Sequence, residues 1–352
     1  MMNEKKTELN NCTNIKGILM LSIIFYHSMV IFASSSWFRI PGKSSVIFKI
    51  LAQFLNSFHI YAFVFISGYI YYYIKYEKGG YNNKLLFMWN KFKRLIIPYI
   101  FVSAIWAIPI YVYFFRPKRD EIVAKFLFGN SPEQLWFLLM LFWVFLIYNF
   151  IFEWIQKNYI LGTIMILILC FVGMIWDFTI DYFQFFKALQ FILFFHMGCS
   201  WRNSKYEKKW EPFKQISTIK IVILQLALFF VTLYIGEMNI SMFTKILNLL
   251  LTVLLHAFNA WASFIVLQRF ICNNKLENNK ILSFVSQNGM CMFLFHQQII
   301  YCILANIMDY IQEPVVLVVI TFVLAVSITL AISCILSKYK ITRFLIGEKV
   351  KS

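Results

Sequence analysis

The sequence has few charged residues, and its acidic residues are especially rare. Of 352 residues, 16 are Asp or Glu; charged residues make up 14% of the chain, and the mean hydropathy is +0.69. A globular domain of this size cannot bury so much apolar surface in one core. The composition therefore excludes an ordinary soluble domain and predicts a polytopic membrane protein.

Several motifs of known chemistry are also missing. The chain contains no Walker loop, no GxSxG elbow, no His and Glu set at metal-ligand spacing, and no Asp or Glu deep inside an apolar run. Its seven cysteines are scattered and form no CxxC pair, which is typical of small buried side chains rather than of a zinc or disulfide framework. The sequence thus predicts no metal site.

What the chain has in excess is positive charge. A net charge of +17 can indicate nucleic-acid binding, but here the basic residues lie in short loops between apolar runs. Membrane topology explains that placement better. We therefore expect contacts with membrane lipids and none with nucleic acid.

Apolar runs long enough to cross a bilayer predict an all-α integral membrane protein with about ten transmembrane helices. The expected spans are residues 15–33, 46–74, 95–115, 135–152, 159–176, 183–200, 216–236, 243–266, 282–305 and 314–336. Placing the N-terminus inside puts 24 of the 33 Lys and Arg residues on the cytoplasmic side. The positive-inside rule then predicts that both termini are cytoplasmic.

The whole chain, residues 1–352, is expected to form one membrane domain, because no loop is long enough to be a separate soluble domain. Basic residues before the first run and small residues after it imitate a secretory signal peptide. We expect an uncleaved helix instead, since the run is long enough to span the membrane.

All five histidines lie in or at the end of apolar spans: His27, His59, His196, His256 and His296. An ionisable ring in hydrocarbon needs a partner or a water-filled cavity, and it often marks a functional site. His27, His59 and His296 are expected near the midplane and are the candidate site residues. For His59 a hydrogen bond to a neighbouring carbonyl is an equally good interpretation, and for His196 and His256 a structural role is favoured.

Three cations, Lys91, Lys93 and Arg94, lie in what the hydropathy predicts to be a cytoplasmic loop, just where the third span begins. Cations beside the free amides of a helix start can bind phosphate groups. The alternative is an ordinary basic flank that contacts anionic lipid headgroups.

The expected outer side holds acidic residues that can orient a histidine or bind a hydroxylated ligand, and the sequence does not choose among them. They are Asp120, Glu121, Glu133, Asp177, Asp181, Glu237, Asp309 and Glu313.

Five short motifs occur in a familiar order along the chain. They are Lys16-Gly17 with His27 ten residues on, Phe58-His59 through Ser67-Gly68-Tyr69, Lys93-Arg94 through Pro98-Tyr99, Leu135-Trp136-Phe137-Leu138, and Asn288 through His296. In this order, on a ten-span chain, the sequence resembles the membrane-bound acyltransferase-3 family, whose members O-acylate polysaccharides and other extracytoplasmic glycans. The family's Arg-x-x-Arg pair is matched here by Lys91 and Arg94, and the acidic residue that often precedes its Lys-Gly pair is absent.

The resemblance implies an O-acetyltransferase of the bacterial cytoplasmic membrane. Acetyl-CoA would be the donor, with its phosphates against Lys91, Lys93 and Arg94, and the acceptor would be a surface or capsular polysaccharide or a lipid-linked glycan. His27 would act as general base or carry the acyl group briefly, assisted by His59 and His296. A polysaccharide transporter or flippase with a histidine-lined path is the alternative from another class.

Overall fold

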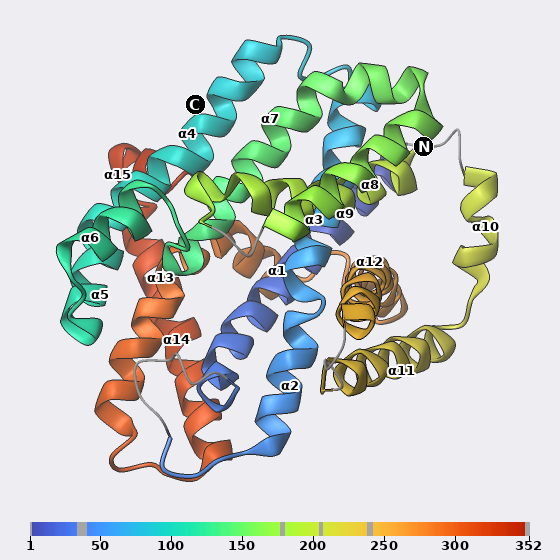
Figure 1. Ribbon diagram of the computed structural model, residues 1–352. Coiled ribbons are helices and arrows are strands. Elements are labelled where there is room, and N and C mark those ends of the chain that lie inside the picture. The colour runs from blue at the N-terminus through green and yellow to red at the C-terminus, as the bar shows by residue number, and fades with distance from the viewer. Residues whose placement is uncertain (1, 34–40, 177–179, 204–206, 238–241, 349–352) are drawn as a thin grey trace. The chain divides into compact units, whose positions relative to one another are not determined.

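The computed structural model describes residues 2–33, 41–176, 180–203, 207–237 and 242–348 (Figure 1). The structure is 86% helical, and the described residues contain no β-strand. This confirms the all-α fold class. Because every backbone group of an α-helix is satisfied within its own segment, this is the architecture expected for apolar segments in a bilayer.

The helices follow one another with short connections. Those of the N-terminal half are α1 (Met2–Met29), α2 (Val46–Asn56), α3 (His59–Tyr72), α4 (Lys84–Val102), α5 (Ile108–Phe115), α6 (Arg119–Ile122) and α7 (Trp136–Lys157). Those of the C-terminal half are α8 (Tyr159–Trp176), α9 (Phe185–Arg202), α10 (Glu207–Gln215), α11 (Thr218–Glu237), α12 (Met242–Asn273), α13 (Lys280–Ile307), α14 (Pro314–Leu336) and α15 (Lys340–Leu345).

Nine helical segments of the described chain are long and apolar enough to cross a membrane. Each overlaps one of the ten predicted spans, and α8 and α14 coincide with the spans predicted at 159–176 and 314–336. The predicted span 183–200 is helix α9, which does not meet the same criterion of apolarity. The chain is thus a multi-pass membrane protein, and the cytoplasmic placement of both termini stays a prediction.

Two predicted segments differ from the structure. The run 46–74 is not one helix, because the chain breaks at Ser57 and Phe58 between α2 and α3. The third span begins at Lys84, where Asn83 caps the helix by accepting a hydrogen bond from the Leu86 amide at 2.9 Å. The prediction of a basic loop at residues 90–94 was therefore wrong: its cations lie inside α4, because hydropathy does not detect the polar first turns of a membrane helix.

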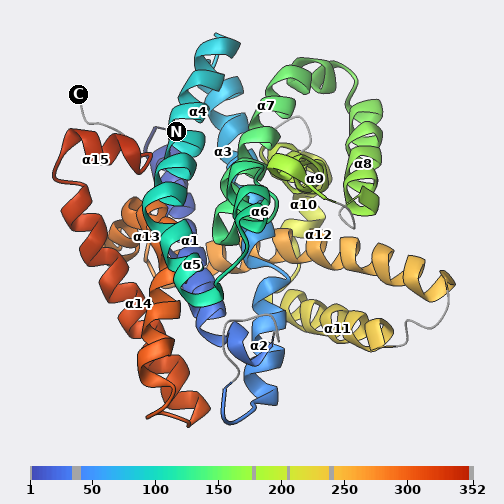
Figure 2. The same cartoon turned by 60° about the vertical axis from the view of Figure 1, so that its left-hand side comes forward.

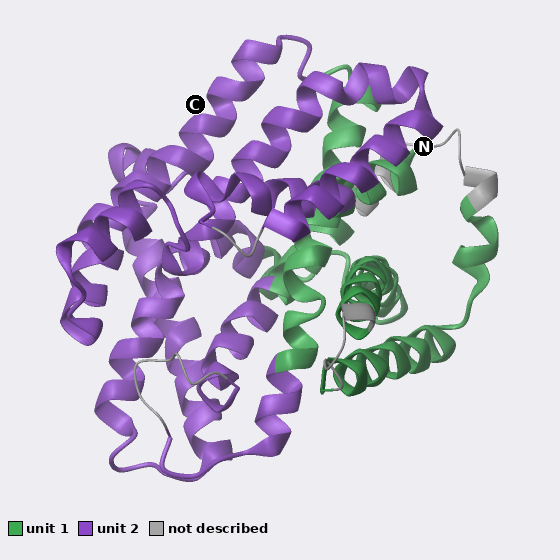
Figure 3. Cartoon of the chain, in the orientation of Figure 1, with its two compact units in different colours: residues 1–19, 53–80, 194–283 green, residues 20–52, 81–193, 284–352 purple. Residues whose placement is uncertain are grey.

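The chain folds into two compact units, which Figure 3 shows in two colours. Unit 1 comprises residues 1–19, 53–80 and 194–283, and unit 2 comprises residues 20–52, 81–193 and 284–352. The prediction of a single domain over residues 1–352 remains a prediction.

Unit 1 contains two close helix contacts at glycines. A Cβ on Gly68 of α3 would lie 2.0 Å from the Phe195 carbonyl oxygen, and one on Gly198 of α9 would lie 1.9 Å from the Phe65 carbonyl oxygen. The backbones of α3 and α9 therefore touch where only glycine fits, as expected for small residues at membrane helix contacts. Elsewhere in this unit α11 packs along α12 (Figure 2).

A further glycine of unit 1 belongs to the Lys16-Gly17 motif. A Cβ on Gly17 would lie 2.6 Å from the Leu282 carbonyl oxygen, so α1 and the first turn of α13 meet there without a side chain between them. Asn14 binds the connection that precedes α13, because its amide donates to the carbonyls of Leu276 at 2.6 Å and Glu277 at 3.1 Å. This glycine is explained by packing.

In unit 2, α4 packs along α7 (Figure 2) and α15 packs against α4. Pro98 lies inside α4, and a π-helical turn, Ser103–Ala107, follows before α5. Gly347 has φ +72° and comes so close to α4 that a Cβ would lie 2.6 Å from the Arg94 carbonyl oxygen. The end of the described chain is thereby held against the basic segment of α4.

Candidate active site

The structure brings two of the predicted histidines together in unit 2. The Nε2 atom of His296 on α13 lies 3.2 Å from the Nδ1 atom of His27 on α1, and the two rings meet edge to face with centroids 4.7 Å apart. His296 is completely buried, whereas His27 is partly exposed. His27 is therefore the more accessible ring of the pair.

Backbone carbonyls define which nitrogen of each ring carries the proton. The Nδ1 atom of His296 lies 2.8 Å from the Phe293 oxygen, and that of His27 lies 2.9 Å from the Ile23 oxygen. Because a carbonyl oxygen only accepts, both Nδ1 atoms are donors in the neutral rings. His27 then shares its Nδ1 proton between Ile23 and His296, and its Nε2 atom is the basic nitrogen.

A buried carboxylate forms a second polar cluster in unit 2. Glu133, whose side chain is 7% exposed, accepts an ion pair from Lys125 at 2.7 Å. It also accepts hydrogen bonds from the Gln297 amide at 2.5 Å and the Tyr301 hydroxyl at 2.6 Å. We name these four residues, Glu133, Lys125, Gln297 and Tyr301, the Glu133 cluster.

The segment that carries Glu133 is held rigidly against α13. Gln134 and Gln298 exchange hydrogen bonds of 2.6 and 3.0 Å, and the Gln134 amide also donates to the Leu294 carbonyl at 2.8 Å. Ser131 and Glu133 both have positive φ, +55° and +50°, which is strained for residues other than glycine. The helix α7 begins directly afterwards at Trp136, where the sequence predicted the start of a span.

The three predicted phosphate-binding cations of α4 have different surroundings. The Lys91 ammonium lies 3.4 Å from the ring centroid of Phe145 and 5.3 Å from that of Phe87, so aromatic faces surround it. The Lys93 ammonium lies 5.8 Å from the Trp89 ring, and Arg94 is exposed. Arg94 is therefore the most exposed of the three cations.

Tyr81 belongs to the loop before α4 and lies close to the basic segment of that helix. Burial raises the pKa of the Tyr81 hydroxyl, and the nearby positive charge of Arg94 partly offsets the increase. The Arg94 Nε atom also donates to the Gly347 carbonyl at 3.4 Å. The guanidinium is thus oriented by the C-terminal segment while much of it stays accessible.

His59, the third predicted site residue, belongs to unit 1. It is completely buried as the first residue of α3, and its Nδ1 atom hydrogen-bonds to the Leu55 carbonyl of α2. This contact spans the break between α2 and α3. It is the carbonyl contact that the sequence left open as the structural alternative.

His196 and His256 also lie in unit 1 and have structural contacts. The Nε2 atom of His196 lies 3.5 Å from the Ser200 hydroxyl one turn along α9, and the His256 ring stacks on Tyr61 with centroids 3.9 Å apart. Such contacts fit the structural role favoured for both residues.

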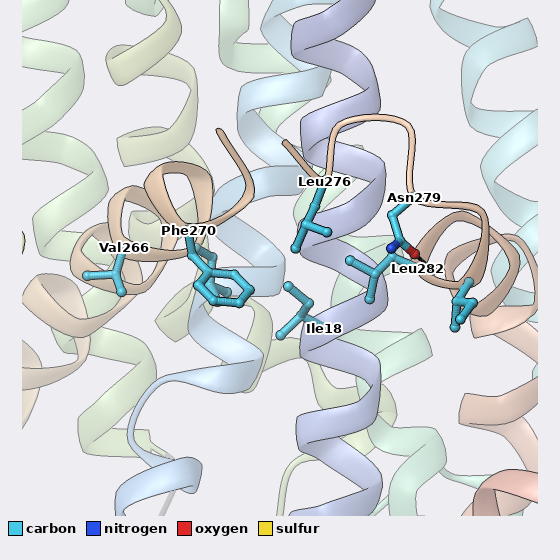
Figure 4. A pocket seen from close by; sticks show the side chains of 8 residues that line it. Ile18, Val266, Phe270, Leu276, Asn279 and Leu282 are labelled. Carbon is cyan, nitrogen blue, oxygen red and sulfur yellow. Dashed lines mark hydrogen bonds between the residues drawn. The ribbon is translucent and has the colours of Figure 1, made fainter. Parts of the chain in front are cut away.

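Two cavities among the described residues are almost wholly apolar. In unit 1, a cavity of about 530 Å³ lies beside Ile18 and the α12–α13 connection, where Asn279 is its polar residue and accepts from the Leu282 amide (Figure 4). In unit 2, a cavity of about 580 Å³ lies along α4, and Tyr99 and Ser103 are among the residues that line it. No histidine or carboxylate lines either cavity. Both cavities therefore suit the binding of an apolar chain better than the catalysis of acyl transfer.

The sequence did not single out Glu133, although this residue was one of its eight acidic candidates. Among those eight, Asp177 lies outside the described residues, and Glu313 forms an exposed ion pair with Lys43. Asp181 accepts hydrogen bonds from the amides of Phe186 and Lys187 at 3.0 and 2.8 Å, which is a helix-capping role. One sequence signal could have favoured Glu133: it lies three residues before the apolar run of α7, next to a proline and a glutamine.

The fold and the histidine pair define a polytopic α-helical membrane protein in which a partly exposed imidazole meets a buried one. The chain belongs to the acyltransferase-3 family: the model of that family, described as an acyltransferase domain, matches residues 10–338. The protein is therefore a membrane acyltransferase. No match was found among curated proteins or among solved structures.

Proposed function

We propose that this protein transfers an acyl group, in the first instance acetyl, from cytoplasmic acetyl-CoA to a hydroxyl of a surface or capsular polysaccharide or lipid-linked glycan. The enzyme would be an O-acetyltransferase of the bacterial cytoplasmic membrane. The observation that carries the proposal is the contact between His27 and His296, since this contact and the backbone carbonyls beside it leave Nε2 of His27 as the basic nitrogen of the pair.

His27 is the general base in this mechanism. Its Nδ1 proton is directed at Ile23 and His296, so its Nε2 lone pair takes the proton from the acceptor hydroxyl as the oxygen attacks the thioester carbonyl. The carbon–sulfur bond breaks, and the thiolate of coenzyme A leaves with the proton returned from the imidazolium. Attack by His27 itself, giving a short-lived acyl-imidazole, is the covalent version of the same transfer.

His296 orients His27 and accepts part of its Nδ1 hydrogen bond, which also stabilises the imidazolium that forms. The neighbouring Phe293 carbonyl fixes His296 in the tautomer that this requires. His59 is retained as a second-rank site residue, because a buried imidazole in a membrane helix can still bind an oxyanion or the acceptor.

The donor's phosphates would lie against Arg94, Lys93 and Lys91. Arg94 offers a planar fork suited to phosphate oxygens, and the Gly347 carbonyl holds it in place. Lys91, whose ammonium lies against the Phe145 ring, would contribute positive electrostatic potential and contact the phosphates less directly.

A direct test uses the purified protein in lipid nanodiscs with acetyl-CoA carrying a labelled acetyl group. The acceptor is the host's own surface polysaccharide after mild base has removed its O-esters. The wild-type protein is expected to transfer label to the glycan and His27→Ala is not. A protein that moves the glycan across vesicles without transferring label would be a transporter, and the proposal would be wrong.

A further inference from the structure

Glu133 is a buried carboxylate, and the acyl transfer proposed at His27 does not need it. Its side chain is 7% exposed in an apolar protein, and a carboxylate in such surroundings is costly unless charged or polar partners compensate it. It also has a strained backbone, with φ +50°. Strain of this kind gathers at binding sites, where the surrounding structure holds a residue in a required position.

The Glu133 cluster offers donors and acceptors together. The Lys125 ammonium has three protons, and one contact joins it to Glu133. Gln297 adds an amide oxygen as an acceptor, and the Tyr301 hydroxyl donates to Glu133 and accepts from Gln297. A sugar hydroxyl also donates and accepts, so it needs both kinds of partner at one place. One acidic and one basic group balance each other, which fits a neutral ligand.

Aromatic rings lie directly beside these polar groups. The Lys125 ammonium is 4.5 Å from the Tyr111 ring centroid, and Tyr111 stacks on Phe115 with centroids 4.7 Å apart. Phe115 in turn packs edge to face on Tyr301 at 5.7 Å. Aromatic faces with a few convergent polar groups are the usual composition of a ligand site, and the apolar face of a sugar ring packs well on them.

Helix α13 connects the cluster to the histidine pair. Gln297 follows His296 in the chain, and Tyr301 lies five residues beyond His296, which is about 7.5 Å along a helix axis. One sugar unit of the glycan can therefore contact Tyr301 and Glu133 while a hydroxyl of the same or the next sugar unit approaches His27.

We propose that the Glu133 cluster binds the acceptor, and that the acceptor is a neutral glycan recognised through hydroxyls that are not themselves acylated. Glu133 accepts from one sugar hydroxyl and Lys125 donates to another. Tyr301 donates its one proton to Glu133 and so holds the carboxylate in position, and the aromatic rings support the sugar face. This inference rests on the proposed function for the identity of the acceptor, but glycan binding can be measured without any acyl transfer.

The experiment measures binding of fluorescently labelled, de-O-acylated host polysaccharide to the protein in nanodiscs without donor. Glu133→Gln and Tyr301→Phe are expected to weaken binding about tenfold or more, while acetyl-CoA affinity changes less than about twofold. A Glu133→Gln protein that binds the glycan like the wild type would overturn the inference. Should Glu133→Gln fail to fold, Tyr301→Phe decides, because it removes one hydroxyl only.

Two variants separate binding from a structural role. The double variant Glu133→Gln with Lys125→Met removes the ion pair without leaving an unpaired buried charge. It is expected to recover thermal stability but not glycan affinity; recovered affinity would show that the cluster only holds the fold. Glu313→Gln breaks the exposed ion pair with Lys43 and is the control for a charge change elsewhere in unit 2, with glycan affinity unchanged.

The same measurements distinguish failure of the two proposals. Glycan binding that depends on Glu133, in a protein that transfers no acetyl group, would leave the glycan site standing and refute the acetyltransferase. Acetyl transfer that depends on His27, with glycan affinity indifferent to Glu133, would refute the glycan site alone.

Discussion

The Nε2 atom of His296 lies 3.2 Å from the Nδ1 atom of His27, across 269 residues of sequence. Each ring also places its Nδ1 atom against a backbone carbonyl, which makes the pair a directed chain of donors and acceptors. In the proposed mechanism this leaves the Nε2 atom of His27 as the base, because the contacts of Nδ1 set the tautomer of the ring.

Replacing His27 with Ala or Gln should lower acetyl transfer about a hundredfold to ten-thousandfold, because the general base is lost. The measurement is label transferred to the de-O-acylated polysaccharide at matched protein amounts. His256→Gln is the control, since His256 stacks on Tyr61 in unit 1 and has no part in the proposed chemistry. Normal transfer by a well-folded His27→Ala protein would refute the catalytic role.

Replacing His296 with Leu should have a smaller effect, about tenfold to a hundredfold in turnover. The variant keeps His27 but removes the hydrogen-bond acceptor that orients it. Losing a hydrogen bond to a group that becomes charged during the reaction typically lowers the rate by about this factor. Turnover and the KM for acetyl-CoA are measured separately, and the KM is expected to stay unchanged. An equal fall for His296→Leu and His27→Ala would instead make both rings reacting groups.

For His59, two substitutions are compared. His59→Leu removes the hydrogen bond to Leu55 and should reduce thermal stability, because this contact joins α2 to α3. His59→Gln keeps a donor for Leu55 but lacks the second ring nitrogen that would bind an oxyanion or the acceptor, so transfer should fall about tenfold while stability is retained. Full transfer by His59→Gln would reduce this histidine to a structural role.

The cations of α4 should differ in their contribution to donor binding. Arg94→Ala is expected to weaken acetyl-CoA binding about tenfold, since a charged, partly bidentate contact to phosphate is lost. Lys91→Met, which keeps an apolar contact with Phe145, should change donor affinity less. Equilibrium binding of labelled acetyl-CoA checks both, and an Arg94→Ala protein with wild-type affinity would leave the basic segment with a topological role only.

Gly68 tests the packing of α3 on α9. Gly68→Val places a side chain where a Cβ already lies 2.0 Å from the Phe195 carbonyl oxygen, so the variant should lose at least about 1–3 kcal/mol of stability. Gly236→Ala is the matched control, because its nearest neighbour would be the Asn248 amide nitrogen at 3.8 Å. Thermal denaturation in detergent should show a large fall for the first variant and none for the second.

The sequence predicted the fold class and most membrane helices because hydropathy is a local property of a run of residues. It failed where local signals are weak: at the break before His59, and at the first turns of α4, where Lys84 and Lys91 made helix look like loop. Small residues such as Gly68 could be recognised as contact points, but their partners on α9 could not.

By itself, then, the sequence determined that this is an all-α membrane protein of the acyltransferase-3 family with a histidine in its first span. Only the tertiary structure decided that His27 meets His296, and that Glu133, out of eight acidic candidates, is the one held among Lys125, Gln297 and Tyr301. The physical reason is that the hydropathy that places a helix in a bilayer is a property of consecutive residues in one segment. Which side chains meet depends on how separate helices pack, and that depends on residues far apart in the chain.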